Sequence, residues 1–161
     1  MGSMSDSPRQ DSLAASREDI LSILPHRPPF LFVDRVVKLA PGLLIAAERD
    51  IKADEPWFRG HFPGRPILPG VLVTDALAQT AGLLWGLSRK VKGIEPDSRG
   101  FLLAAANMKF FNPAVPGEVL AMSARGERKF GDLYSYHVEA QAGRRIVATG
   151  VVTLAMIAEA A

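Results

Sequence analysis

The apolar and polar residues of the chain predict one long buried helix near its middle. Residues 70–90 contain no proline, and as a helix they would carry apolar side chains around most of its circumference. A helix of this length spans roughly 30 Å at 1.5 Å per residue. Because a helix that is apolar on nearly all sides avoids water, the pattern predicts that residues 70–90 lie inside the protein.

Strand patterns follow this helix and precede it. The clearest is in residues 133–141, where apolar and polar residues alternate without interruption. A short helix is predicted near the start of the chain, from the N-cap residue Ser16 to about Leu24. The other strand candidates are residues 30–39, 43–51, 101–111, 119–128 and 145–157.

The order of these elements indicates the fold class. It is a short helix, two strands, a proline- and glycine-rich loop at residues 54–69, the buried helix and then four strands in succession. One buried helix needs a sheet wide enough to wrap around it. The sequence therefore predicts an α+β fold in which an antiparallel sheet curls around a single central helix. The 161 residues fit one domain, which we expect at residues 16–161 after a disordered leader and tag remnant at residues 1–15.

The composition narrows the classes of function. The chain has no cysteine and three histidines, which excludes a thiolate nucleophile and makes a metal site or a cofactor unexpected. A net charge of +2 without a long Lys/Arg run argues against nucleic-acid binding. The longest apolar region, residues 71–87, contains Thr74, Asp75, Gln79 and Thr80, which are rare in a membrane span. The absence of cysteine fits a reducing cytoplasm, where we expect the protein to act.

Two side chains are candidates for chemistry. His61 lies in the middle of the proline- and glycine-rich loop, among Phe58, Phe62 and Ile67. Apolar surroundings favour a neutral imidazole, which can accept a proton near pH 7. Asp75 lies in the second turn of the buried helix, where an unpaired carboxylate is costly. Each also has an ordinary structural explanation, as a packed histidine or as an aspartate bonded within the core.

One face of the buried helix differs from the others. Asp75, Gln79, Gly82 and Gly86 follow one another at intervals of 4, 3 and 4 residues and therefore share a face. The two glycines favour close packing against a neighbouring element, and the alternative is a groove for a ligand chain that leads away from Asp75. At the start of the helix, Gly70 combines free N–H groups with the positive end of the helix dipole, which suits a developing oxyanion.

Several segments resemble one enzyme family. Residues 61–72, His-Phe-Pro-Gly-Arg-Pro-Ile-Leu-Pro-Gly-Val-Leu, and residues 75–79, Asp-Ala-Leu-Ala-Gln, resemble the signature of the 3-hydroxyacyl-[acyl-carrier-protein] dehydratases of bacterial fatty-acid synthesis. Residues 24–36 resemble the opening motif of that family, and residues 107–117 resemble its strand and turn after the helix. The resemblance keeps the family's order and its spacing between the catalytic histidine and acid.

This resemblance implies a hot-dog fold, an obligate homodimer and a hydro-lyase that converts a 3-hydroxyacyl thioester to the trans-2-enoyl thioester. It implies that His61 removes the proton alpha to the thioester and that Asp75 of the partner subunit helps the 3-hydroxyl leave as water. The Gly70 N–H would polarise the carbonyl, and Gln79 would hold the carboxylate. The residues that would border an acyl tunnel are Phe62, Gly82 and Phe110.

The implied partner is an acyl carrier protein that presents the substrate on a phosphopantetheine arm. Its acidic surface would meet exposed basic side chains, and the dimers could assemble further into a trimer of dimers. The candidates for this basic surface are Arg59, Arg65, Arg89, Lys90, Lys92 and Lys109.

The chain departs from the family pattern at two places. The dehydratase-only branch usually carries glutamate where this chain has Asp75, and aspartate is usual in the sister branch, which also isomerises the double bond. In the dehydratase-only branch an arginine pair often follows the lysine/arginine-phenylalanine step, and this chain has Phe111-Asn112 in its place. Three alternatives therefore stay open: a bifunctional dehydratase/isomerase, which Asp75 favours, a hot-dog thioesterase, which the His61 loop argues against, and a non-catalytic acyl-binding paralogue.

Overall fold

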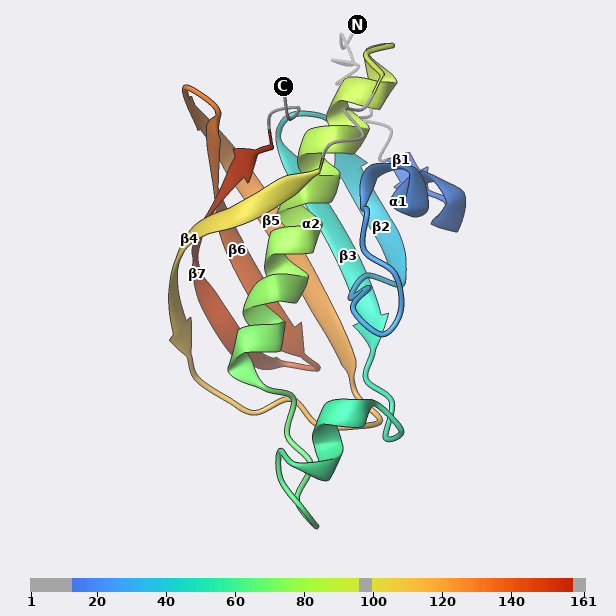
Figure 1. Cartoon of the computed structure of the whole chain (residues 1–161), viewed down its shortest axis with the longest axis vertical. Helices are drawn as coiled ribbons and strands as arrows, with labels where there is room; N and C mark the ends of the chain where they lie inside the picture. Colours follow the sequence, from blue (N-terminus) through green and yellow to red (C-terminus); the bar gives the residue numbers. More distant parts are fainter. Residues whose placement is uncertain (1–12, 96–99, 158–161) are drawn as a thin grey trace, which may run out of the picture.

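The computed structural model describes residues 13–95 and 100–157 and consists of one curved antiparallel sheet around a long helix (Figure 1). The helices are α1 (Arg17–Ile23), the 3-10 helix η1 (Pro56–Arg59) and α2 (Gly70–Val91). The strands are β1 (Leu13–Ala15), β2 (Arg35–Ala40), β3 (Leu44–Asp50), β4 (Phe101–Phe110), β5 (Val119–Phe130), β6 (Leu133–Ala142) and β7 (Arg145–Met156), and they lie in the order β1-β2-β3-β5-β6-β7-β4. The predicted α+β class is confirmed.

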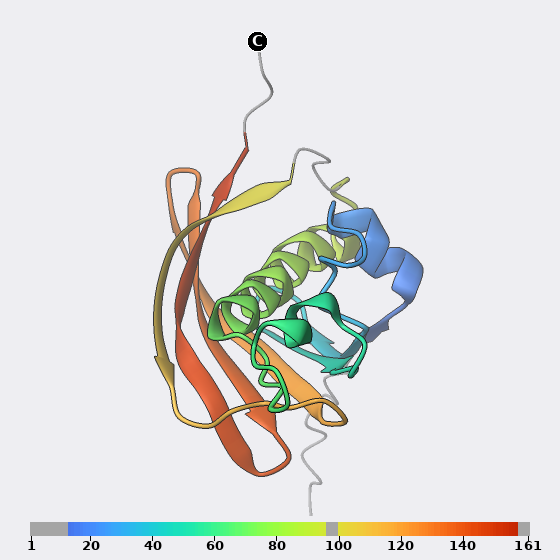
Figure 2. The same ribbon diagram turned by 60° about the horizontal axis from the view of Figure 1, so that its bottom comes forward.

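The helix α2 fills the space inside the curve of the sheet because nearly all of its surface is apolar. Every residue from 76 to 88 is buried. Figure 2 shows the sheet bending around α2 on one side while α1 lies on another. The helix is long and apolar enough to cross a membrane, but most of it is enclosed by the protein, as expected of a core helix.

Two glycines let neighbouring side chains lie against the backbone of α2. A Cβ atom at Gly82 would lie 2.3 Å from the ring of Phe101, and a Cβ atom at Gly86 would lie 2.3 Å from Cγ2 of Ile23. Close packing therefore explains both positions. A groove at Gly82, which is the alternative that the sequence allows, would require the ring of Phe101 to move, so the prediction that Gly82 borders a tunnel has no support in this conformation.

The alternation in β6 is confirmed. Tyr134, Tyr136 and Val138 are buried against α2, and His137 lies exposed on the outer face of the sheet. The strands β5 and β7 also bury residues against α2 while many of their other residues remain partly or fully exposed, whereas β4 has no buried residue.

Two predictions about the first part of the chain are wrong. Residues 13–15, predicted as part of a disordered leader, form β1 and pair with β2 at the edge of the sheet; the rest of that leader, residues 1–12, lies outside the described residues. Residues 30–34, predicted as the start of a strand, are not strand. The N–H of Phe32 instead donates to Oε1 of Gln79 at 2.8 Å, so the first part of this segment is bonded to the helix. Only its last residue, Asp34, donates its N–H to the sheet, to the carbonyl of Glu48 at 2.9 Å.

Candidate active site

The loop between η1 and α2 folds back on itself around His61. The backbone N–H of His61 donates to the carbonyl of Trp57 at 3.0 Å, and its own carbonyl accepts from Ile67 at 2.9 Å. Phe62 and Arg65 exchange two further backbone hydrogen bonds, and the His61–Phe62 peptide bond is cis. The backbone of His61 is therefore fixed by bonds on both sides.

The imidazole of His61 is oriented by the carbonyl of Ile67, which lies 2.8 Å from Nδ1. Because a carbonyl oxygen can only accept, we assign the ring proton to Nδ1, which leaves a free lone pair on Nε2. Phe62 stacks on the imidazole with ring centroids 4.1 Å apart. The half-buried ring is thus held with Nε2 as the atom that can accept a proton.

A pocket of about 350 Å³ lies between this loop, the start of α2 and the segment that follows β4. His61, Gly70 and Phe110 line it, whereas Phe62 and Gly82 do not. A Cβ atom at residue 70 would lie 3.1 Å from the ring of Phe110. The N–H of Gly70 makes no hydrogen bond within residues 13–95 and 100–157. The pocket therefore combines a base, a free backbone donor and an apolar wall.

Asp75 does not line this pocket. Its Oδ2 accepts from Nε2 of Gln79 at 2.8 Å, and the same nitrogen donates to the carbonyl of Phe30 at 3.0 Å. Together with the bond from Phe32, these contacts use both ends of the buried Gln79 amide. Gln79 therefore fixes the carboxylate of Asp75, but one chain by itself does not bring that carboxylate into the pocket of His61.

His26 is the second histidine near this chemistry, and the sequence favours a structural role for it. Burial lowers the pKa of His26, and the carboxylate of Asp75 acts in the opposite direction without cancelling this effect. The ring packs 5.9 Å from that of Phe101, and its buried Nδ1 has no partner among the described residues. His26 is thus a partly buried imidazole close enough to Asp75 to feel its charge, and burial is the main influence on its pKa.

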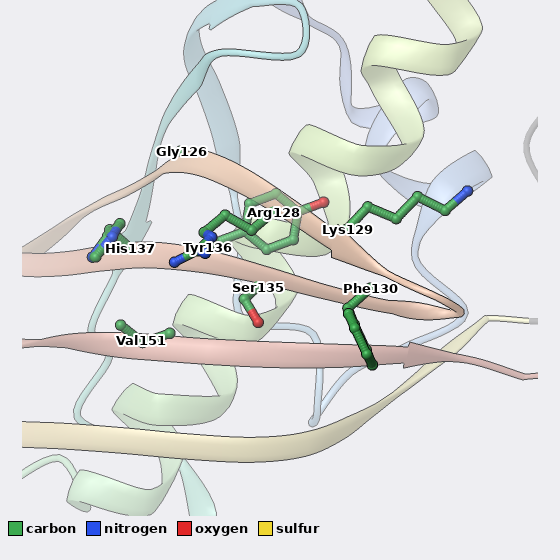
Figure 3. Close-up of a pocket in the computed structure, with 8 residues that line it drawn as sticks. All are labelled: Gly126, Arg128, Lys129, Phe130, Ser135, Tyr136, His137 and Val151. Atoms are coloured by element: carbon green, nitrogen blue, oxygen red, sulfur yellow. The ribbon is translucent and has the colours of Figure 1, made fainter.

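A second depression, of about 360 Å³, lies on the outer face of the sheet over β5, β6 and β7 (Figure 3). Ser135, His137 and Val151 lie on this face, and α2 lies behind the strands. None of the residues that the sequence predicts for catalysis lines it. The described residues also contain no group of three histidine, aspartate or glutamate side chains that could hold a metal ion. The pocket of His61 is therefore the candidate site.

The basic side chains predicted for carrier docking fall into two groups. Three of them are exposed: Arg59 at the end of η1, Arg65 on the His61 loop and Lys109 on β4, the strand that leads to the pocket. The other three lie in or just after the last turn of α2, roughly 30 Å from its first residue at 1.5 Å per residue. There Arg89 lies over the Trp85 ring and Lys90 pairs with Asp19. Only the first group lies near the pocket.

One buried ion pair close in sequence to His61 is not among the features that the sequence predicts. Arg49 and Glu55 are paired, with side chains 5% and 11% exposed. The available signal is the strand pattern of β3, in which Arg49 follows Ile45 and Ala47 at two-residue intervals and must therefore point inward.

Comparison with known proteins assigns the chain to a family. A family model described as the FabA-like domain matches residues 24–150. The chain belongs to the FabA-like family. Among the curated FabA-like relatives, the "3-hydroxyacyl-[acyl-carrier-protein] dehydratase FabZ" of Polynucleobacter necessarius is 39% identical over 144 residues, covering 89% of this chain and 94% of the relative. The FabZ of Klebsiella pneumoniae is 41% identical over 111 residues, covering 69% and 72%.

Solved structures agree with this family at the level of the fold. A chain of the dehydratase heterocomplex ApeI:P from Xenorhabdus doucetiae superposes with a TM-score of 0.75 at 17% identity, covering 87% of this chain and 91% of that one. The E. coli PaaI protein from the phenylacetic acid degradation operon gives a TM-score of 0.58 at 14% identity, with coverages of 80% and 81%. This FabA-like chain therefore has the hot-dog fold that its motifs imply.

Proposed function

We propose that this protein is a hydro-lyase that removes water from 3-hydroxyacyl thioesters carried by acyl carrier protein, in fatty-acid biosynthesis. The observation that carries the proposal is identity of 39% to a FabZ dehydratase along nearly the whole length of both chains. The pocket supports it, because His61 and the Gly70 N–H supply two of the three groups that a β-elimination next to a carbonyl requires.

The proposed reaction uses each group at a defined atom. Nε2 of His61 takes the proton from C2 of the substrate, and the electron pair of that C–H bond moves toward the thioester carbonyl. The free N–H of Gly70 stabilises the negative charge that develops on the carbonyl oxygen. The C3–O bond then breaks, the C2–C3 double bond forms, and the carboxyl group of Asp75 gives a proton to the departing hydroxyl, which leaves as water.

The acid comes from a second copy of the chain in this proposal. Among the residues that the structure describes, β4 ends the sheet and pairs only with β7, and its side chains are largely exposed. Leu102 is 62% and Phe110 is 51% exposed. An exposed apolar edge strand is a template for pairing with another chain. Because Phe110 also lines the pocket of His61, a copy bound along β4 would lie beside that pocket and could supply Asp75.

The same proposal covers the partner and the compartment. Arg59, Arg65 and Lys109 give the region around the pocket exposed positive charge that suits an acidic carrier protein. The absence of cysteine fits the cytoplasm. Assembly of the dimers into a trimer of dimers stays a prediction.

Product analysis tests the reaction. The purified protein is incubated with a 3-hydroxyacyl thioester on acyl carrier protein, and the acyl group is followed by mass spectrometry and chromatography. We expect a trans-2-enoyl thioester, one water lighter than the substrate. A shifted double bond would identify a dehydratase/isomerase, and release of the free acid would identify a thioesterase. Binding without turnover would overturn the proposal in favour of an acyl-binding paralogue.

Mixed dimers test the shared site. We expect His61→Ala to abolish dehydration and Asp75→Asn to lower turnover on the order of 10²-fold. A dimer of one His61→Ala chain and one Asp75→Asn chain has one site with both groups intact, so random mixing should restore about a quarter of the wild-type activity. If both groups came from one chain, no mixed dimer would contain an intact site and no activity would return.

A further inference from the structure

A buried ion pair joins β3 to the loop that carries His61. Nη2 of Arg49 donates to Oε1 of Glu55, and only 5% of Arg49 and 11% of Glu55 side-chain surface is exposed. Burying two charges is costly even when they are paired. Neither residue takes part in the elimination proposed above, so the pair calls for another explanation.

The carboxylate of Glu55 connects to His61 through Trp57. Its Oε2 accepts from the indole Nε1 of Trp57 at 3.0 Å. The backbone carbonyl of Trp57 in turn accepts from the N–H of His61 at 3.0 Å. Glu55 also precedes η1 as its N-cap residue, and its carbonyl accepts from Phe58 at 3.2 Å. Two hydrogen bonds thus separate the Glu55 carboxylate from the backbone of His61.

Arg49 anchors this connection to a rigid part of the sheet. The strand β3 pairs with β5 without a register shift from Leu44 to Asp50. The guanidinium of Arg49 lies 5.0 Å from the centroid of the Phe32 ring, and Trp57 meets the same ring edge-on at 5.6 Å. Phe32 is 1% exposed. The guanidinium of Arg49 and the indole of Trp57 are therefore packed around one buried ring.

We propose that Arg49 and Glu55 are positioning residues for His61. They fix the imidazole in the pocket by tying the loop of their own chain to β3, and they act on that chain's His61 and not on its Asp75. This inference rests on the proposed dehydratase function and on a site shared between two chains. Because a displacement of about 1 Å in a reacting group can lower the rate on the order of 10²-fold, a device that holds the base in place affects turnover more than substrate binding.

The first test replaces Glu55 in the intact dimer. Glu55→Gln removes the charge that pairs with Arg49, and we expect kcat to fall on the order of 10-fold or more while KM changes less than about 2-fold. The matched control is Glu48→Gln on β3, where the carboxylate pairs with the half-exposed Arg35 at 2.7 Å. The control should keep its kcat. An unchanged kcat for Glu55→Gln would overturn the proposal.

The second test separates positioning from a general loss of folding. In mixed dimers, the intact site takes His61 from the Asp75→Asn chain and Asp75 from the His61→Ala chain. Glu55→Gln on the Asp75→Asn chain should remove most of the restored activity, and the same substitution on the His61→Ala chain should leave it. Equal loss in both arrangements would overturn the proposal. No restored activity without Glu55→Gln would instead refute the shared site, so the two failures are distinguishable.

Trp57→Phe is the alternative variant if Glu55→Gln does not fold. It removes the Nε1–H donor that reaches Glu55 and keeps an aromatic ring against Phe32. If the melting temperature shows that Glu55→Gln does not fold, Trp57→Phe replaces it in both experiments. We then expect kcat to fall less than the fall predicted for Glu55→Gln. In mixed dimers, Trp57→Phe should again lower the restored activity only when the Asp75→Asn chain carries it. An unchanged kcat for a folded Trp57→Phe protein would overturn the proposal.

Discussion

Gly150 in β7 occupies a position where no side chain fits. A Cβ atom there would lie 2.2 Å from the backbone oxygen of Asn107 and 2.6 Å from Sδ of Met108. Both residues belong to β4, which pairs with β7 in this register. Backbone atoms of a paired strand cannot move aside without loss of hydrogen bonds. The absence of a side chain at this one residue therefore lets β4 lie close to the rest of the sheet.

This contact predicts the effect of a single methyl group. Gly150→Ala should lower the free energy of unfolding by about 2 kcal/mol, because the added atom forces the two strands apart. Gly60→Ala is the control, since no atom lies within 4 Å of the point that its methyl group would occupy and its φ of −113° suits any residue. Urea unfolding of the two variants measures the difference. Equal stability would contradict the close approach of β4 and β7.

At the scale of elements, α1 is short, and its first turn is capped and also linked to α2. Oγ of Ser16 accepts from the backbone N–H of Asp19 at 3.1 Å, and Oδ2 of Asp19 accepts from the backbone N–H of Ser16 at 3.0 Å. This capping box satisfies the first turn of the helix. The other oxygen of Asp19 accepts from Nζ of Lys90 at 2.8 Å, which links α1 to the last turn of α2.

The link between these helices predicts a pH dependence. The hydrogen bonds of Asp19, with Lys90 first and Ser16 next, lower its pKa from 3.8 to about 2. Because the folded pKa lies below the unfolded value, this stabilisation is present above the unfolded pKa and is lost as the pH falls toward 2. The pair is partly exposed, which limits the effect to about 1 kcal/mol. In urea unfolding, the difference in free energy of unfolding between wild type and Asp19→Asn should narrow as the pH falls from 5 to 2. A difference that stays constant over this range would contradict the prediction.

At the scale of the whole molecule, the edge of the sheet at β4 bears more on the association of two chains than the buried middle of the sheet does. Within the described residues the strand order leaves β4 with one neighbour, and most of its residues are exposed although Phe101 and Phe110 near its ends lie close to α2. Ala106 illustrates this, because it is exposed although its partner Val152 in β7 is fully buried. A second copy along this edge would bury the side chains that one chain leaves open.

An arginine on that edge tests the proposed dimer. Ala106→Arg should give a monomer by size-exclusion chromatography with light scattering, because the long charged side chain would be forced into an apolar interface. Dehydration should be lost together with the dimer, since each site needs both chains. Ala121→Arg, on an exposed position of β5, is the matched control and should change neither property. A dimeric Ala106→Arg protein would exclude β4 as the interface.

Local patterns predict much of this fold. The run that becomes α2 and the alternation of β6 are recognisable because helix and strand periodicities are properties of neighbouring residues. Patterns fail where a contact depends on a distant partner. The strand β1 exists because β2 lies beside it, and the strand predicted from residue 30 begins only at Arg35 because Gln79, far along the chain, bonds to Phe30 and Phe32. Neither contact is encoded in adjacent residues.

The sequence by itself determined the central helix, the sheet that surrounds it, and His61 and Asp75 as the groups on which a dehydratase would depend. Only the tertiary structure decided how those groups are held. Ile67 orients the imidazole, Gln79 fixes the carboxylate, Phe101 fills the space at Gly82, and Arg49 with Glu55 ties the loop to β3. The physical reason is that periodicity reports which residues are buried, whereas hydrogen bonds and close packing depend on which residues meet in space.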